Sequence, residues 1–282
     1  MALTSVSTAT ASRGATAPSS TKGSYSPGFY DDQSIGSRRS ARETIPLLQR
    51  FVHVSSVLDV GCGVGTWLSA FREHGVSDVM GLDGTYVDRA RLQIPAEQFV
   101  PCDLTAPPEL PRKFDLVTSL EVAEHLPAGA ADGFVRYLTS FSPAVLFSAA
   151  VPGQGGKHHV NEQWPDYWAA RFEQHGFTVV DCLRPLLWNN PHVEWWYAQN
   201  TFLFVKSETL AGNSALSEAA RRTDRQRLAI VHPRAYQAAQ GKFELVSLRR
   251  ALRLAESIVQ ATFLRRNPPP EPFSGKLGTR PS

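Results

Sequence analysis

The chain has 282 residues, enough for one large domain or for one domain with an appendage. Hydrophobic residues make up 42% and charged residues 20%, a balance that is typical of a globular enzyme and excludes a disordered or fibrous chain. No apolar run approaches the roughly 18 residues of a bilayer span. The cysteines Cys62, Cys102 and Cys182 show no CxxC spacing, so we expect no thiolate zinc site, no disulfide framework, and a cytoplasmic location.

Charge is distributed unevenly along the chain. Residues 1–206 carry 16 Lys and Arg against 20 Asp and Glu, a net charge of −4. Residues 207–282 carry 13 against 6, a net charge of +7. An acidic body without a basic stripe argues against a protein that follows a nucleic-acid backbone over many phosphates.

The first segments precede any strand pattern. Residues 1–24 are rich in Ser, Thr and Ala and lack the apolar core of a signal peptide, which predicts a disordered leader. Residues 38–52 have apolar side chains at helical spacing, with Ser37 as a candidate N-cap and a possible kink at Pro46. We therefore expect one amphipathic helix before the first strand.

Short apolar runs then alternate with helical stretches. This alternation is typical of an α/β fold in which a parallel sheet is covered on both faces. The expected strands lie at 57–60, 79–83, 99–100, 114–120, 144–150, 177–181 and 200–206. The expected helices lie at 66–74, near Arg89, at 130–141 and at 166–175, and a loop with Trp188, Trp195 and Trp196 joins the last two strands.

The pattern after residue 206 is helical. One helix is expected over 214–230 with a stop at Pro233, and a second over about 243–266 with a stop at Pro268. The second has apolar residues spaced by three and four, with Arg249, Arg250 and Arg253 between them. A basic amphipathic helix fits docking on the body or on a second subunit, and also a membrane surface or an acidic partner. Residues 267–282 are expected to be a disordered tail.

The segment VLDVGCGVGTW (57–67) runs from a strand through a glycine-rich turn into a helix. Its spacing is GxGxG rather than the GxGxxG of dinucleotide folds, and Asp59 precedes Gly61 by two residues. A carboxylate there would repel a pyrophosphate but attract a cationic ligand. S-adenosylmethionine carries an ammonium and a sulfonium and no phosphate, so it fits better than NAD.

Two further acids follow later strands. Asp83 ends one strand, where its carboxylate can accept hydrogen bonds from both ribose hydroxyls, and Asp103 follows the next, near an adenine amino group. Each acid also fits a turn or a helix cap. Three acids in register with three successive strand ends favour the cofactor interpretation.

On these residues the chain resembles the class I S-adenosylmethionine-dependent methyltransferases over about residues 25–206. The resemblance implies a doubly wound, mostly parallel, seven-stranded Rossmann-like sheet whose last strand, 200–206, is antiparallel. It implies a methyltransferase domain over 25–206, to which the helical pattern adds an extension over 207–266. The cofactor residues that it implies are Asp59, Gly61, Cys62, Gly63, Gly65, Asp83, Gly84, Asp103, Leu104 and Glu121. The sequence of segments 148–168 and 195–200 is similar to that of bacterial methyltransferases of small molecules or saccharides.

The segment EVAEH (121–125) suggests a second chemistry. On a helix, Glu121, Glu124 and His125 would share one face, and with His159 they could hold a divalent ion such as Mg²⁺, Mn²⁺ or Zn²⁺. This pattern is similar to that of the metal-dependent 2′-O-methyltransferases of small RNAs. It also recurs in the superfamily without a metal, so both interpretations stay open.

The acceptor side needs a base if the nucleophile is an alcohol or phenol. A histidine suits this task, and His159 is the first candidate, followed by His125 and His158. These histidines can also serve only as loop contacts. Aromatic residues after the PGQGG loop can line an acceptor pocket or belong to the core: Trp164, Tyr167, Trp168, Trp188, Trp195, Trp196 and Tyr197.

The leading hypothesis is methyl transfer from S-adenosylmethionine to an oxygen, or less readily a nitrogen, of a small molecule or saccharide. The alternatives are an RNA ribose methyltransferase, disfavoured by the acidic body, and a cofactor-binding interaction protein without turnover. A nicotinamide oxidoreductase is disfavoured by Asp59 and the glycine spacing. No nucleic-acid partner is expected, and the basic C-terminal helix is a candidate peripheral or subunit contact.

Overall fold

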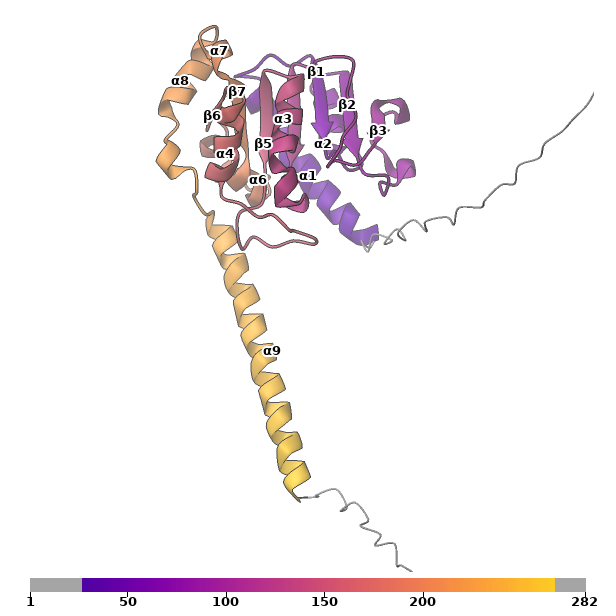
Figure 1. Ribbon diagram of the computed structural model, residues 1–282, viewed down its shortest axis with the longest axis vertical. Coiled ribbons are helices and arrows are strands. Elements are labelled where there is room, and N and C mark those ends of the chain that lie inside the picture. Colours follow the sequence, from indigo (N-terminus) through magenta and orange to yellow (C-terminus); the bar gives the residue numbers. More distant parts are fainter. Residues whose placement is uncertain (1–26, 267–282) are drawn as a thin grey trace, which may run out of the picture.

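The computed structural model describes residues 27–266, without the side chains of 27–34, 242–247 and 258–266. Its centre is a seven-stranded sheet of order β3-β2-β1-β4-β5-β7-β6, parallel except for β7 (Figure 1). The strands are β1 Ser56–Val60, β2 Asp78–Asp83, β3 Phe99–Pro101, β4 Leu116–Leu120, β5 Ala144–Ser148, β6 Phe177–Val180 and β7 Phe202–Lys206. The expected doubly wound α/β fold and its antiparallel last strand are confirmed.

Helices cover both faces of the sheet. One face packs against α1 Pro27–Leu48, α2 Thr66–Glu73, α5 Arg184–Leu187, α6 Trp195–Asn200 and α8 Ser214–Arg222. The other packs against α3 Ala131–Phe141 and α4 Pro165–Gln174. Within β1, Val57 belongs to the first apolar cluster and Leu58 to the second, because successive side chains of a strand point to opposite faces. Burial on both faces explains the continuous apolar runs of the strands.

The helix before β1 differs from the expectation at its start. It begins at Pro27 rather than near residue 38, so Ser37 lies inside α1 and is no N-cap. Its Oγ instead hydrogen-bonds the Tyr197 hydroxyl at 3.0 Å. The expected apolar face is confirmed, because Ala41, Ile45 and Leu48 are fully buried.

Two other expectations were wrong in detail. The segment between β6 and β7 is no plain loop, since it holds α5 and α6, and Trp195 and Trp196 lie on α6. Pro233 does not stop a helix but begins one, α9 Pro233–Arg266, because proline lacks only an N–H that the first turn leaves unused. Between β7 and α9 lie α7 Ser207–Leu210, α8 and the 3₁₀ turn Arg225–Arg227.

Helix α9 extends away from the body rather than packing on it (Figure 1). The expected leader 1–24 and tail 267–282 lie outside the described residues. No helix of the described part is long and apolar enough to cross a membrane.

Candidate active site at the carboxyl ends of the strands

The turn after β1 is shaped for close approach of a ligand to the backbone. Gly61, Gly63 and Gly65 have φ angles of 90°, 55° and 81°, a region that side chains disfavour. A Cβ on Gly61 would lie 2.3 Å from Val122 Cγ2, so any side chain there is excluded by contact as well as by conformation. The turn leads into α2, which packs on β1 and β2, and it lies beside the boundary between β1 and β4, where the strand order reverses. Ligands of open α/β sheets bind at this point.

Asp59 forms part of the floor of this cleft. It is 3% exposed and its Oδ1 accepts a hydrogen bond from Thr118 Oγ1 at 2.7 Å. Burial raises the pKa of Asp59 to about 7, the Thr118 bond opposes this rise, and nearby Asp83 adds to it. A cationic ligand beside Asp59 would therefore favour the ionised form and be attracted by it.

Asp83 lies at the end of β2 as expected, but its carboxylate is already engaged. Oδ2 accepts from the Gly63 N–H at 2.6 Å, and Oδ1 accepts from the Gly84 N–H and the Tyr86 hydroxyl, each at 2.6 Å. The bond to Gly63 ties the glycine turn to β2. Asp83 does not line the cleft in this structure, because Tyr86 lies against it.

The other residues implied for adenosine binding also lie outside the cleft. A Cβ on Gly84 would meet the Tyr86 ring at 2.1 Å, so Gly84 makes room for that ring. Asp103 is exposed and accepts from the Thr105 N–H and hydroxyl at 2.8 and 2.7 Å, the geometry of a turn cap. Those two bonds lower the pKa of Asp103. Leu104 packs against the apolar cluster under α3 and α4.

Glu121 follows β4 and takes an unusual backbone conformation. Its φ is 55°, one of two positive values among the described residues other than glycine, the second being His158. Oε1 accepts from Asn200 Nδ2 at 3.1 Å, and Oε2 accepts from Gln154 Nε2 at 2.8 Å. Burial raises the pKa of Glu121, and these amide bonds counteract it. The carboxylate is thus fixed at the cleft by two amides from distant segments.

The expected helix over 121–125 was wrong. Only a 3₁₀ turn, Ala123–His125, follows Glu121, so Glu121 does not share a face with Glu124 and His125. Glu124, His125 and His159 do converge: their candidate ligand atoms lie within 4.8 Å of one another. The N–H groups of Val160 and Asn161 donate to the Glu124 carbonyl and thereby hold the histidine loop in place.

The carboxylate of Glu124 is 0% exposed, and neither oxygen has a hydrogen-bond partner within the described part of the chain. Burial, reinforced by nearby Glu121, raises the pKa of Glu124 well above its usual value. Partial burial at the cleft and the neighbouring His159 lower the pKa of His125. A protonated carboxyl or a bound cation would each satisfy this arrangement.

His159 is oriented by Glu162. Its Nδ1 lies 2.8 Å from Glu162 Oε1, and its ring meets that of His125 edge-on with centroids 4.8 Å apart. Partial burial of Glu162 works against ionisation, but bonds from His159 and from the Gly153 and Gly155 N–H groups lower its pKa. An ionised partner on Nδ1 leaves Nε2 as the proton acceptor. His158 is exposed beside it.

The cleft encloses about 460 Å³. The predicted site residues that line it are Asp59, Gly61, Cys62, Gly63, Glu121, Glu124, His125 and His159. Gly65, Asp83, Gly84, Asp103, Leu104 and His158 do not. Of the aromatics, Trp195, Trp196 and Tyr197 line the cleft, whereas Trp168 is core, 2% exposed against Phe147.

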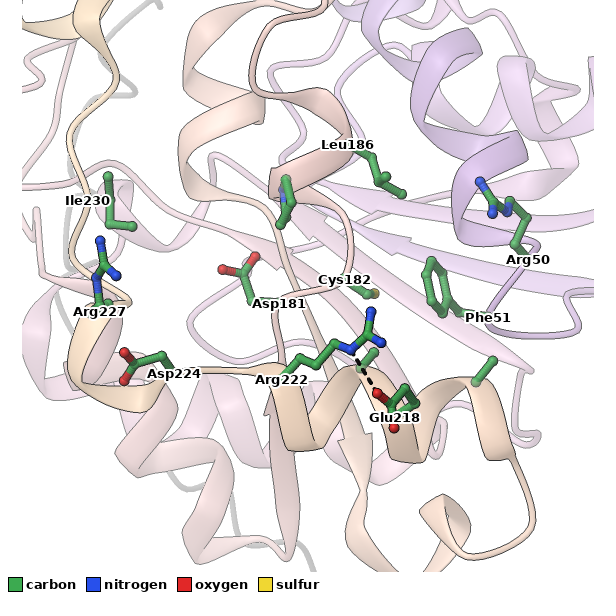
Figure 2. Close-up of a pocket in the computed structure, with 13 residues that line it drawn as sticks. Arg50, Phe51, Asp181, Cys182, Leu186, Glu218, Arg222, Asp224, Arg227 and Ile230 are labelled. Atoms are coloured by element: carbon green, nitrogen blue, oxygen red, sulfur yellow. Dashed lines mark hydrogen bonds and ion pairs between the residues drawn. The ribbon is translucent and has the colours of Figure 1, made fainter.

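A second cavity, of about 570 Å³, lies beside the end of β6, between the turn that follows α1 and the helices α5 and α8 (Figure 2). Three of its six charged lining residues form ion pairs: Arg222 contacts Glu218 at 2.7 Å, and Asp181 is held by Arg184 at 2.6 Å. Burial raises the pKa of its Cys182 thiol to about 12, which removes any thiolate nucleophile at neutral pH. Nothing in this cavity therefore matches the chemistry gathered at the glycine turn.

The family described as a methyltransferase domain matches residues 33–190, more than half of the chain. The chain belongs to this methyltransferase family. The match and the sheet order confirm the resemblance to class I S-adenosylmethionine-dependent methyltransferases. The glycine turn and Glu121 lie inside the matched range, whereas Trp195, Trp196 and Asn200 lie beyond it.

Solved structures with a similar fold include DesVI of Streptomyces venezuelae, at 17% identity over 63% of this chain and 94% of that chain, with a TM-score of 0.49. Magnesium protoporphyrin IX methyltransferase of Synechocystis PCC 6803, with bound S-adenosylhomocysteine, is 18% identical over 62% and 85%, with a TM-score of 0.44. CalS10 of Micromonospora echinaspora, an amino pentose methyltransferase, is 15% identical over 63% and 91%, with a TM-score of 0.42. No curated protein sequence matches the chain.

Several residues at the cleft were not predicted from the sequence. Asn200 and Gln154 hold Glu121, and Asn200 in turn is bonded by Gln199, whose Oε1 accepts from the His232 N–H. Amide side chains carry no spacing signal of their own. The only signals in the sequence are that Asn200 ends the segment WWYAQN and that Gln154 lies in the glycine-rich loop PGQGG.

Proposed function

We propose that this methyltransferase moves the methyl group of S-adenosylmethionine to a hydroxyl oxygen of a small molecule or saccharide. The observation that carries the proposal is the pair His159 and Glu162 at the cleft, with Nδ1 of His159 fixed at 2.8 Å from the carboxylate. This pairing directs Nε2 toward proton transfer, which an alcohol or phenol acceptor requires and a neutral amine requires less.

The reaction is an in-line displacement. The acceptor oxygen forms a bond to the methyl carbon while the carbon–sulfur bond breaks, and the sulfonium leaves as the neutral thioether of S-adenosylhomocysteine. His159 Nε2 takes the acceptor proton. Most of the rate comes from holding oxygen and methyl in line in a dry cleft, where Trp195, Trp196 and Tyr197 supply apolar wall.

The donor is expected to sit with its methionine part toward Asp59 and Glu121. Asp59 is buried and Glu121 is half-buried, both at the cleft, and Glu121 is held by two amides. Tyr86 would have to move from Asp83 for the ribose to reach that carboxylate.

Methyl transfer from a labelled donor to matched alcohol and amine acceptors, for example a methyl glycoside and its amino analogue, tests this function. We expect label on the hydroxyl compounds and a large loss of turnover in His159→Gln. Transfer only to amines, undiminished in His159→Gln, would overturn the oxygen assignment.

A second candidate follows from the orphaned carboxylate of Glu124. We propose as the alternative that Glu124, His125 and His159 hold a divalent cation; when bound, it would lower the pKa of the acceptor hydroxyl. Glu121 is not in this group, in contrast to the expected ligand set. Titration of Mn²⁺ or Zn²⁺ by calorimetry should give a heat that Glu124→Gln removes and Glu121→Gln retains. No heat, or the same heat in Glu124→Gln, would exclude the metal.

A further inference from the structure

The C-terminal helix α9 is the longest helix of the structure and leaves the body at the cleft. Its early residue Ala238 lines the cleft, and the preceding His232 is 7% exposed and anchored to Gln199 and to the Trp188 carbonyl. At 1.5 Å per residue, its 34 residues span about 50 Å. Figure 1 shows that almost all of this length lies away from the sheet and its helices.

The described side chains of the distal helix cover no part of the body. All of residues 248–257 are exposed, including Leu248 at 57%, Leu252 at 56% and Leu254 at 65%. Of the partners that the sequence left open, this segment's own body is therefore excluded, and a second subunit, a membrane surface or an acidic partner stay open. Large exposed apolar side chains in a row mark a surface that a partner covers.

The apolar and charged residues of this segment lie on separate sides. With 100° between successive residues, Leu248, Leu252 and Leu254 fall, together with Ala251 and Ala255, within an arc of about 160°. Arg249, Arg250, Arg253, Glu256 and Ser257 fill the opposite arc of about 120°. The same ten residues thus present an apolar face that can enter a lipid layer and a cationic face that can contact negative head groups.

We propose that α9 is a membrane-surface anchor, in which the 248–257 segment lies in the interface of an anionic lipid bilayer. Three arginines against one glutamate complement a negative surface, and the leucine arc fits the acyl boundary. The segment carries a net charge of +2, which a second copy would duplicate and an anionic surface would neutralise, so the membrane is favoured over a second copy. The net charge of the whole sequence is −4 over residues 1–206 and +7 over 207–282, so an anionic membrane would attract the C-terminal part and repel the body.

Sedimentation of the full chain with vesicles tests the anchor. Vesicles of phosphatidylcholine alone are compared with vesicles that also contain phosphatidylglycerol. We expect binding to the anionic vesicles that falls as salt rises, and binding at least about tenfold weaker to the neutral ones. Equal partition into both, or no binding to either, would overturn the proposal.

Variants separate the anchor from general charge effects. Arg249→Glu with Arg253→Glu should weaken anionic-vesicle binding at least about tenfold. The matched control, Arg72→Glu with Arg136→Glu, reverses two exposed arginines of the body and should leave binding close to wild type. Leu248→Ser with Leu252→Ser should weaken binding as well. Equal losses in the control would overturn the proposal.

The same variants also test whether a second copy of the chain, and not a membrane, covers the leucines. Analytical ultracentrifugation without lipid should show no dimer that depends on the leucines. If the wild type forms a dimer, Leu248→Ser with Leu252→Ser dissociates it, and no vesicle binding is seen, then α9 is a dimer contact and not a membrane anchor. S-adenosylhomocysteine affinity, measured by calorimetry, should be the same in all variants, so failure of the anchor leaves the proposed function standing.

Discussion

The Tyr86 hydroxyl donates a hydrogen bond to Asp83 Oδ1 at 2.6 Å, so a side chain of the protein occupies the carboxylate expected to bind ribose. Tyr86 is 67% exposed, and its ring can turn away without uncovering the core. Two backbone N–H groups hold Asp83 from the other side. In the proposed donor site, Tyr86 therefore covers the carboxylate meant for the adenosine half, while the methionine half opens into the cleft.

Tyr86→Phe should tighten S-adenosylhomocysteine binding about three- to tenfold, because the ribose then replaces no internal hydrogen bond. Asp83→Ala should abolish binding. Calorimetry checks both, with Tyr236→Phe as a control, because Tyr236 is 60% exposed and its hydroxyl accepts from Gln240 Nε2 within α9. Weaker binding by Tyr86→Phe would show that the hydroxyl assists the donor instead of competing with it.

Asn200→Ala should weaken S-adenosylhomocysteine binding about tenfold, because Glu121 loses the amide that fixes Oε1 and is free to turn. Since Asn200 is 2% exposed, the free energy of unfolding should also fall by about 1–3 kcal/mol. Asn190→Ala is the matched control, because Asn190 Nδ2 donates to Glu43 Oε2 at 2.8 Å outside the cleft. If both variants bind the product like wild type, Asn200 does not position Glu121.

His159→Gln should lower methyl transfer by about 10²- to 10⁴-fold while leaving product affinity unchanged, as expected for loss of a general base. Glu162→Gln should lower it less, because the His159 ring loses the carboxylate that orients it while Nε2 remains to accept the proton. Single-turnover transfer of labelled methyl measures both, with His192→Ala as a surface control. A His159→Gln enzyme as fast as wild type ends the case for this residue as base or ligand.

Asp59 gives a prediction for stability against pH in the donor-free protein. Its folded pKa of about 7 lies above its usual 3.8, so between these values the folded state holds a proton that the unfolded state has released. Stability is thus lost as pH rises from about 4 to 7, by up to about 1.4 kcal/mol per pH unit. Asp59→Asn keeps an acceptor for Thr118 and should unfold at a higher temperature than wild type at pH 8, with the gap closing toward pH 4. A constant gap across this range would contradict the raised pKa.

Much of the fold follows from the sequence. The strands are apolar runs because both faces of the sheet are buried, and all seven expected segments form strands within a few residues of the expected bounds. The glycine turn could also be predicted, since Gly61 has a positive φ and no room for a Cβ, so the position requires glycine. These features depend on residues that are close together in the sequence, so the local sequence pattern predicts them.

The rest of the site depends on contacts between distant segments. The positive φ of Glu121 prevents the expected helix, and a glutamate in the sequence gives no sign of a positive φ. Asn200 reaches Glu121 across 79 positions of sequence, and Tyr86 reaches Asp83 only because the turn after β2 folds back. Helical spacing likewise marked α9 as amphipathic without showing that it leaves the body.

Calorimetric titration of the full chain with S-adenosylhomocysteine tests the central claim, that the glycine turn binds the methyl donor. Wild type should bind with one site, and Gly129→Ala should match it, because a Cβ at Gly129 meets nothing within 4 Å. Gly61→Ala should lose binding, since its Cβ would lie 2.3 Å from Val122 and its φ of 90° disfavours a side chain. No heat from wild type at millimolar product, or undiminished binding by Gly61→Ala, would contradict the account.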